Sequence, residues 1–280
     1  DPARCGEIVV PASSIAPDPL DVRRVVARRA AFELRPRDVV NLGVGISAMI
    51  PNVASEEGIA DLITLTVESG VVGGVPGHAR EFGTSVNPRA ILDQSYQFDF
   101  YDGGGLSCAF LSFAQVDPQG NVNVTRFGKR YDGAGGFINI TQNTQRLVFN
   151  GSLTGGDFDI GVADGELKIR RDGAFKKFVP AVDQISFSGR LARERGQQVS
   201  FVTDRAVFEL EADGLVLTEI APGARLKEDV LEKIGFEVRV SEQLRTMDAR
   251  IFRNGPMGVH DEFIAKAPRH AGNAAQGERA

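Results

Sequence analysis

The chain has 280 residues, 42% hydrophobic and 25% charged, a composition typical of a soluble globular protein with enough core for one large or two small domains. Its net charge of −5 and scattered Lys and Arg residues argue against binding to nucleic acid or an anionic membrane. We expect no membrane span, no signal peptide and no metal site, and Cys5 and Cys108 form no disulfide pattern, so a reducing, cytoplasmic setting is expected.

The chain is expected to begin with an extended arm over residues 1–20, because three prolines fall within the first 17 residues. A helix is predicted to follow, with Asp18 as its N-cap and Pro19 at its first position. Arg35-Pro36 is expected to end it. The helix carries four arginines that we expect on a solvated face: Arg23, Arg24, Arg28 and Arg29.

A strand–helix–strand unit is predicted next. Residues 38–42 form an apolar strand that runs into Gly43-Val44-Gly45, a helix covers about 49–57, and a second strand covers 62–67. This order predicts two parallel strands joined by a helix. The second strand ends at Glu68, and the end of a buried strand in an α/β sheet is where ligands usually bind.

A long glycine-rich stretch over residues 69–105 is predicted to be mostly loop, and a loop of that length inside a compact domain usually carries function. An apolar strand over 106–116, a type I turn at 117–120 and a return strand over 121–125 are expected after it. Later β-structure is expected over 155–181, together with a short helix over 226–234. Further strands are predicted at 146–149, 198–203, 207–211, 215–220 and 236–240.

The predicted fold class is therefore α/β: a three-layer, open, mostly parallel sheet flanked by helices, with a β-rich portion after residue 150. We expect one domain over residues 21–264. From residue 265 the chain is small and polar, so 265–280 is expected to be a disordered tail.

Glu68 supports several kinds of chemistry: a nucleophile, a base or a ligand for sugar hydroxyls. The run from Gly43 to Ala48 fits G-x-G-x-x-[GA], and Glu68 follows at a distance typical of the ribose-binding acid of a dinucleotide fold. A purely structural role for Gly43 and Gly45 also stays open. However, a ribose-binding acid needs no glycines directly after it, whereas Ser69-Gly70 and Gly73-Gly74 follow at once. Glycine loops expose backbone N–H groups, as in an oxyanion hole or a coenzyme A (CoA) site.

The stretch Thr66–Gly74 resembles the Ser-Glu-Asn-Gly signature of the family I coenzyme A-transferases. The resemblance covers most of residues 20–260 and is closest to the fused acetate/propionate and 3-oxoacid CoA-transferases. It extends over Gly83, Asn87-Pro88, Phe98 to Gly105, Asp117 to Val124 and Gly133 to Ile140.

The resemblance implies that Glu68 is the nucleophile of a ping-pong reaction. The glutamate attacks an acyl-CoA to give an acyl-glutamyl anhydride, the CoA thiolate then forms a glutamyl-CoA thioester, and an acceptor carboxylate reverses both steps. Glu is ionised at pH 7, with an ordinary pKa of ~4.3, and needs no general base. It does need N–H groups aimed at the developing oxyanions, and it needs water kept away.

By resemblance, Gly43, Val44 and Gly45 lie on the CoA side of the site, and Gly135 and Gly136 line the thioester with their backbone. Gly104 is a further CoA-binding candidate. For each glycine a turn that requires positive φ is the alternative interpretation. The chain departs from the family pattern at five positions whose effect the sequence leaves open: Ser47, Ala48, Ser69, His78 and Arg80.

The remaining ionisable residues are expected to be less informative. His78, His260 and His270 are too dispersed for a metal site or a triad, and His78 is expected at the surface. Glu56-Glu57 is predicted to be an exposed helix end, and Cys108 a core thiol.

Members of the family have two similar halves, and this chain resembles the second, glutamate-bearing half with its linker. The chain begins at Asp1-Pro2, so we expect it to be processed, trimmed or a fragment. The resemblance implies an acyl-CoA donor, a short-chain carboxylate acceptor, the alpha half as partner and a homo-oligomer of the complete enzyme, with no cofactor beyond the substrates. A nucleotide-binding Rossmann domain and a non-catalytic acyl-CoA-binding homologue remain the alternatives.

Overall fold

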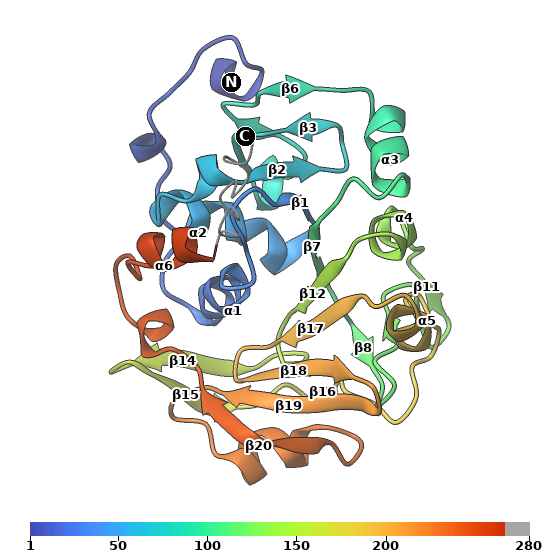
Figure 1. Ribbon diagram of the computed structural model, residues 1–280. Helices are drawn as coiled ribbons and strands as arrows, with labels where there is room; N and C mark the ends of the chain where they lie inside the picture. Colours follow the sequence, from blue (N-terminus) through green and yellow to red (C-terminus); the bar gives the residue numbers. More distant parts are fainter. Residues whose placement is uncertain (267–280) are drawn as a thin grey trace, which may run out of the picture.

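A ten-stranded sheet runs through the computed structural model, which describes residues 1–266 (Figure 1). Its five central strands are parallel, in the order β2 (Thr64–Val67), β1 (Val39–Leu42), β7 (Cys108–Ser112), β12 (Arg146–Asn150) and β17 (Gln198–Val202). Antiparallel pairs extend it with β3 (Val71–Val72) and β6 (Ala90–Ile91) beyond β2, and with β18 (Ala206–Glu211) and β19 (Gly214–Ile220) beyond β17. The edge strand β20 (Arg239–Thr246) pairs parallel to β19. The predicted open, mostly parallel α/β sheet is confirmed.

Helices cover both faces of the sheet and make three layers (Figure 1). One face carries α1 (Val22–Ala31), α2 (Ile50–Glu56) and α6 (His260–Ala265), and the other carries α3 (Gln94–Asp102), α4 (Phe137–Gln142) and α5 (Gly189–Glu194). Each face has its own apolar core. The central strands are buried on both sides, which explains why they read as continuous apolar runs.

Five two-stranded pairs lie outside the ten-stranded sheet in the described part of the chain. The predicted turn at 117–120 is confirmed, since the Gly120 N–H donates to the Asp117 carbonyl at 2.9 Å between β8 (Gln115–Val116) and β9 (Val122–Asn123). The pairs are β4 (Val75–Pro76) with β5 (Ser85–Val86), β8 with β9, β10 (Arg126–Phe127) with β11 (Arg130–Tyr131), β13 (Thr154–Gly155) with β16 (Phe175–Lys176), and β14 (Asp159–Ala163) with β15 (Glu166–Arg171).

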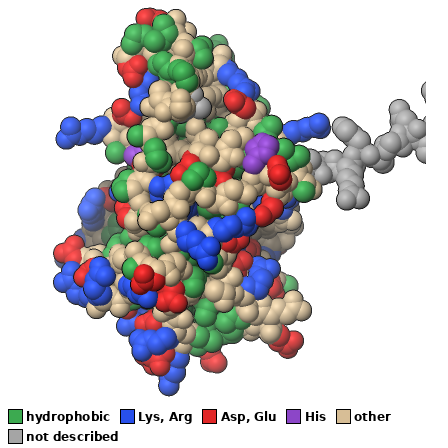
Figure 2. Space-filling view, turned by 90° about the vertical axis from the view of Figure 1, so that its left-hand side faces the viewer, with side chains coloured by type: hydrophobic (Ala, Val, Ile, Leu, Met, Phe, Trp, Pro, Cys, Tyr) green, Lys and Arg blue, Asp and Glu red, His purple; other side chains and the backbone are tan. Residues whose placement is uncertain are grey.

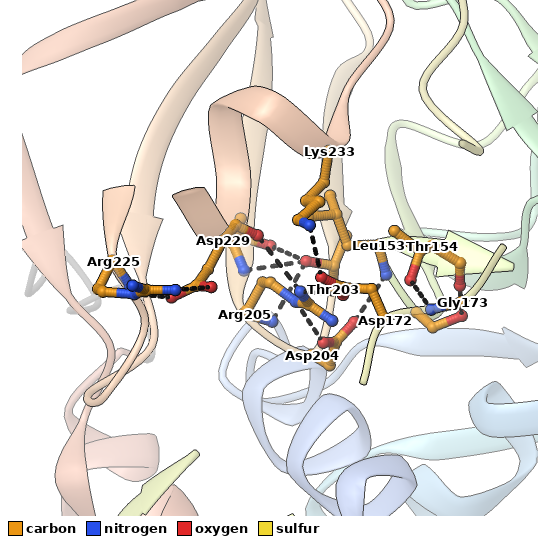
Figure 3. Close-up of polar contacts among 12 residues, drawn as sticks. Leu153, Thr154, Asp172, Gly173, Thr203, Asp204, Arg205, Arg225, Asp229 and Lys233 are labelled. Atoms are coloured by element: carbon orange, nitrogen blue, oxygen red, sulfur yellow. Dashed lines mark hydrogen bonds and ion pairs between the residues drawn. The ribbon is translucent and has the colours of Figure 1, made fainter. Parts of the chain in front are cut away.

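A buried ionic network attaches this β-rich portion to the sheet (Figure 3). Arg205, in the turn between β17 and β18, is fully buried and donates to Asp204 at 2.7 Å and to Asp172 at 2.5 Å. Asp204 also accepts from the backbone N–H of Leu153 at 2.6 Å, and Asp172 pairs with Lys233 at 3.1 Å. The segment between β12 and β17 is therefore fixed to the carboxyl end of β17 by charge-assisted bonds.

Three helix predictions need correction. The first helix begins at Val22 and its N-cap is Asp21, which accepts from the Arg24 N–H at 2.9 Å, whereas Asp18 lies outside it. The stretch predicted as loop over 69–105 contains α3, capped by Asp93. Residues 226–234 form a π turn, η6 (Leu226–Val230), and a 3-10 turn, η7 (Leu231–Lys233). The remaining 3-10 turns are η1 (Pro2–Arg4), η2 (Ala12–Ser14), η3 (Gly45–Met49), η4 (Ala60–Leu62), η5 (Ala79–Glu81) and η8 (Ala249–Phe252).

The arginines of α1 were predicted on a solvated face, and for three of the four this is wrong. Arg28 is fully buried and donates to the carbonyls of Ile251, Arg253 and Gly255. Only Arg23 is exposed. Arg24 pairs with Glu56 and Arg29 with Glu219, each through buried or nearly buried side chains. A buried guanidinium is tolerated here because each finds a carboxylate or a set of carbonyls.

The prediction of an exposed helix end at Glu56-Glu57 is also wrong. The Glu57 carboxylate is buried and accepts from the backbone N–H groups of Met257, Gly258 and Val259 at 2.6–3.1 Å. The Glu57 carboxylate therefore holds the segment that leads into α6.

The face that carries α1, α2 and α6 shows acidic and basic side chains interspersed (Figure 2).

The N-terminal arm lies along the β4–β5 pair. The Asn87 side chain bonds the backbone of Val10 at 2.8 and 3.0 Å, and the Asn87 N–H donates to the carbonyl of Ala3 at 2.9 Å. The predicted tail, residues 265–280, falls outside the described residues except at its start, where Ala265 ends α6. Among residues 1–266, no helix combines the length and hydropathy needed to cross a membrane.

Candidate active site

Glu68 leaves the sheet at the carboxyl end of β2, in the tight turn that joins β2 to β3. Gly70 closes this turn: its N–H donates to the Val67 carbonyl at 3.0 Å, its φ is +104°, and a Cβ there would collide with the carbonyl of Leu92. Only glycine fits such a position. The Ser69 hydroxyl donates to the Gly83 carbonyl at 2.8 Å and fixes the middle of the turn. The backbone beside Glu68 is thus held from both sides.

The glycine loop and the glutamate, 25 positions apart in the numbering, come together across neighbouring strands. Asn41 on β1 pairs in register with Thr66 on β2, so Gly43 and Glu68 each lie two residues further along parallel strands. Such strands run about 4.8 Å apart. A Cβ on Gly43 would meet the Leu111 side chain at 2.9 Å, so this glycine allows β1 to approach β7 closely.

Val44 and Gly45, which follow Gly43 in the loop, lie at the point where the order of strands along the sheet changes direction. The chain places β2 and β7 on opposite sides of β1, and ligands in open α/β sheets bind outside the carboxyl ends of strands at such a point. Val44 is 63% exposed there, and its carbonyl accepts from the Ser112 hydroxyl at 2.9 Å. Gly45 has φ +96° and begins η3.

Gly136 touches the nucleophile candidate directly. It precedes α4, and a Cβ built on it would collide with the Oε2 atom of Glu68 and lie 2.7 Å from Cζ of Phe98. Gly136 has φ −79°, so the close approach, and not the backbone conformation, requires glycine. Gly135 has φ +53° and open space on its Cβ side. Of the two glycines predicted at the thioester, Gly136 thus lies against the glutamate, and Gly135 precedes it in the chain.

Gly104 lies elsewhere. It follows α3 and precedes β7, whose amino end meets the start of β1 through the Ser107 N–H and the Val39 carbonyl at 3.0 Å. Its φ of +82° suits the turn after α3, and its Cβ side is open. The structure therefore brings Gly43, Gly45, Gly135 and Gly136 to the carboxyl edge of the sheet with Glu68, and leaves Gly104 at the opposite edge.

The Glu68 carboxyl is half-buried, and burial raises its pKa above the ordinary glutamate value. Within residues 1–266 no side chain or backbone N–H donates a hydrogen bond to it. The carboxylate is therefore partly stripped of water without being neutralised by a partner, which is the condition of an accessible nucleophile. No group of three or more His, Cys, Asp and Glu side chains in the described part of the chain is arranged to hold a metal ion.

A buried polar cluster beneath Glu68 was not predicted. The Tyr101 hydroxyl on α3 accepts from the Asn41 amide at 3.1 Å and bonds the Thr66 hydroxyl at 2.9 Å, while Thr66 donates to the Val40 carbonyl at 2.8 Å. Tyr101 is 1% exposed. Polar residues within apolar strands were the available signal, because such residues must find partners when buried.

Three of the five positions that depart from the family pattern, Ser47, Ser69 and His78, bond to neighbouring residues. The buried Ser47 hydroxyl donates to the Asn150 side chain at 3.1 Å, which links η3 to the end of β12. His78 pairs with Asp18 at 3.1 Å and its side chain is 33% exposed, beside a cavity of about 390 Å³ under the N-terminal arm. Arg80 is exposed. The Cys108 thiol is buried, as predicted, and burial raises its pKa to about 12.

Comparison with known proteins shows which enzymes this chain is similar to. The chain is 49% identical over 240 residues to acetate CoA-transferase YdiF of Escherichia coli O157:H7, covering 86% of this chain and 45% of the relative. It is 44% identical over 257 residues to caffeate CoA-transferase of Acetobacterium woodii, covering 90% of this chain and 49% of that one. Over most of its length the chain is thus similar to coenzyme A-transferases. No protein-family model matches the chain.

Solved structures of such enzymes agree. The apoenzyme of acyl-CoA transferase YdiF from E. coli O157:H7 superposes with a TM-score of 0.83 at 47% identity, over 90% of this chain and 47% of the other. The thioester complex of the same enzyme with CoA gives 0.81 at 48% identity, over 87% and 46%.

The chain spans about half the length of these transferase relatives. It also matches the acetate CoA-transferase subunit beta of E. coli K12, at 29% identity over 74% of this chain and 89% of that subunit. This match to a beta subunit agrees with the predicted resemblance to the second half.

Proposed function

We propose that this chain is the nucleophile-bearing half of an enzyme that moves CoA from an acyl-CoA to a carboxylic acid. The observation that carries the proposal is the position of Glu68. Its half-buried carboxylate lies at the carboxyl end of β2, against Gly136 and across from Gly43. A carboxylate on a rigid turn, surrounded by glycine backbone, suits attack on a thioester carbonyl.

In the proposed reaction an oxygen of Glu68 attacks the acyl-CoA carbonyl, and the C–S bond breaks to give an acyl-glutamyl anhydride and CoA thiolate. The thiolate attacks the glutamyl carbonyl, which releases the acyl carboxylate and leaves a glutamyl-CoA thioester. An acceptor carboxylate repeats the two steps in reverse order. No step transfers a proton, which agrees with the absence of a histidine or lysine bonded to Glu68 in residues 1–266.

The developing oxyanions need donors. Gly136 lies against the carboxylate, and its N–H has no protein acceptor within the described residues, so we propose this N–H as one of the donors. Gly43, Val44, Gly45 and Gly135 are proposed to line the CoA thioester, because they share its edge of the sheet. Gly104 receives no role at this site.

A nucleotide-binding function is less well supported. A dinucleotide fold places its glycine loop at the N-terminus of an α-helix, where the helix dipole holds the pyrophosphate. Here Gly45 leads into the 3-10 turn η3, and the α-helical α2 starts only at Ile50. A non-catalytic homologue is tested by the experiment below.

The complete enzyme is proposed to include the alpha half, fused or separate, because the chain matches about half of its longer relatives. An acyl-CoA and a short-chain carboxylate are the proposed substrates, and a homo-oligomer of the complete enzyme is the proposed assembly. The two unpaired cysteines, Cys5 and Cys108, support a cytoplasmic location.

Trapping the covalent intermediate tests the proposal. The chain, with the alpha half present, is mixed with acetyl-CoA and then with borohydride, which reduces a glutamyl thioester to an alcohol. Intact mass is expected to fall by ~14 Da, and peptide mapping is expected to assign the loss to Glu68.

Glu68→Ala is expected to abolish the mass change, and Glu81→Ala, which changes an exposed glutamate in η5, is the matched control. An unmodified Glu68 in the complete enzyme would overturn the covalent mechanism and favour a binding-only homologue.

A further inference from the structure

Phe98 lies beside the nucleophile candidate, although neither its charge nor its polarity drew attention to it. A Cβ built on Gly136 would lie 2.7 Å from Cζ and 2.9 Å from Cε1 of Phe98, and it would also collide with Oε2 of Glu68. The ring edge and the carboxylate oxygen therefore border the same small space. Phe98 itself is half-buried.

The ring is held in place by a rigid neighbour. Tyr101, three residues further along α3, meets Phe98 edge to face, with ring centroids 5.8 Å apart and planes at 70°. Tyr101 is anchored through its hydroxyl to Asn41 on β1 and Thr66 on β2. Aromatic pairs of this geometry are favourable beyond the area that they bury. The wall beside Glu68 is thus braced against the same two strands that carry the site.

We propose that Phe98 is the wall that keeps water from acylated Glu68, and so determines how the covalent intermediate divides between carboxylate acceptor and water. This inference rests on the proposed function. Both intermediates of the proposed reaction are reactive carbonyl compounds, and a site that admits water destroys them. The Phe98 ring is apolar and itself offers no hydrogen-bonding group to a water at the glutamyl carbonyl.

The competing reaction is simple hydrolysis. A water oxygen bonds to the glutamyl carbonyl carbon and the C–S bond to CoA breaks. The thiolate takes up one of the two protons of the water, the other passes to solvent, and the Glu68 carboxylate is regenerated. Together with the first half-reaction this converts an acyl-CoA and water into a free acid and CoA. The wall is expected to suppress this reaction relative to transfer.

The test compares hydrolysis with transfer in the complete enzyme, with the alpha half present. Release of CoA from acetyl-CoA is measured without an acceptor, and formation of a new acyl-CoA is measured with propionate as acceptor. Phe98→Ala is expected to raise the ratio of hydrolysis to transfer at least about tenfold, the effect of ~1.4 kcal/mol on a rate. The ratio does not depend on how much of a variant is folded.

Phe98→Leu retains an apolar side chain of useful size and is expected to keep the ratio within about threefold of the unmodified enzyme. Phe100→Ala is the matched control, because it removes the same atoms from the same helix at a side chain that is 44% exposed and packs over Gly105. Its ratio is expected to be unchanged.

The outcomes separate the two proposals. An unmodified enzyme that fails to form the new acyl-CoA would overturn the proposed function and the role of Phe98 with it. Normal transfer together with an unchanged ratio in Phe98→Ala would overturn the role of Phe98 alone. A rise of equal size in Phe100→Ala would also overturn it, because the effect would then belong to the helix and not to the wall.

Discussion

Gly136 is the residue at which the geometry of the site can be changed by one methyl group. Gly136→Ala places a Cβ against the Glu68 carboxylate and the Phe98 ring, while the φ of −79° tolerates alanine. We expect transfer to fall at least about 100-fold, as when an oxyanion-hole group is lost, with little change in thermal stability.

Gly135→Ala is the comparison variant for Gly136→Ala. Its Cβ meets nothing within 4 Å, and its φ of +53° costs only about 1–2 kcal/mol. Steady-state kinetics and a melting curve on both variants check the prediction. Equal losses in the two would show that the loop conformation, and not contact with the carboxylate, controls activity.

Glu209 on β18 gives the protein a pH-dependent stability outside the site. Burial, helped by the nearby Glu33 and Glu219 and opposed by Arg29 and Arg245, raises the pKa of this half-buried carboxyl to about 8. An unfolded glutamate titrates near ~4.3, so the folded state binds an extra proton between these values. The stability gained from that proton is full below pH ~4 and is lost as the pH rises towards 8.

Glu209→Gln is therefore expected to match the unmodified protein in melting temperature near pH 5 and to exceed it increasingly up to pH 9. Each kcal/mol corresponds to roughly 2–4 °C for a chain of this size. Glu211→Gln, two residues along the same strand, changes an exposed carboxylate paired with Arg239 and should leave the pH profile unaltered. A pH-independent difference for Glu209→Gln would contradict the assignment.

At the scale of elements, α1 depends on a segment far away in the sequence. Arg28 supplies hydrogen bonds to three carbonyls between residues 251 and 255. Arg28→Met keeps the apolar stem but leaves buried carbonyls without donors, which is expected to lower the free energy of unfolding by roughly 1–3 kcal/mol.

Arg23→Met on the exposed face of the same helix is the control for Arg28→Met and should stay within about 0.5 kcal/mol. Urea denaturation measures both. If Arg28→Met proved as mild as Arg23→Met, the three carbonyls would have to be satisfied by other donors.

Some elements could be predicted from the sequence and others could not, for physical reasons. β1, β2, β12 and β17 are apolar runs bounded by glycine or charge, so local pattern identifies them. In α3 only Gln97 and Tyr101 are buried, so it shows no apolar stripe and reads as loop. The arginines of α1 were misplaced because local sequence does not reveal the carboxylates and carbonyls that later elements bring.

Part of the candidate site could also be predicted from the sequence. The glycine motifs and Glu68 stand out in the sequence because special backbone conformations and a resemblance point to them. Their meeting across β1 and β2 followed from the predicted βαβ unit. Phe98 and Tyr101 were not assigned to the site. Both lie on α3, about 30 residues after Glu68 in the sequence, and only the packing of α3 against the sheet brings them to it.

At the scale of the whole molecule, the site is one edge of an open sheet, and the other half is expected to complete it. The 280-residue chain alone is expected to show less than about 1% of the transfer rate of the combined halves, because an anhydride at an unclosed site is lost to water. Titrating a separately purified alpha half into the chain and measuring acyl-CoA exchange checks this. Ordinary enzyme rates from the chain alone would contradict the prediction.

The hydrogen bonds that Arg28 donates to residues 251–255, and those that Glu57 accepts from residues 257–259, connect positions up to 227 apart in sequence. Because of these bonds, we expect α1, α2 and residues 251–259 to unfold locally as one cooperative unit. Amide protons of α1 should then exchange at the same rate as those near residues 251–259. A cut in the chain at about residue 250 should destabilise α1 before the other helices.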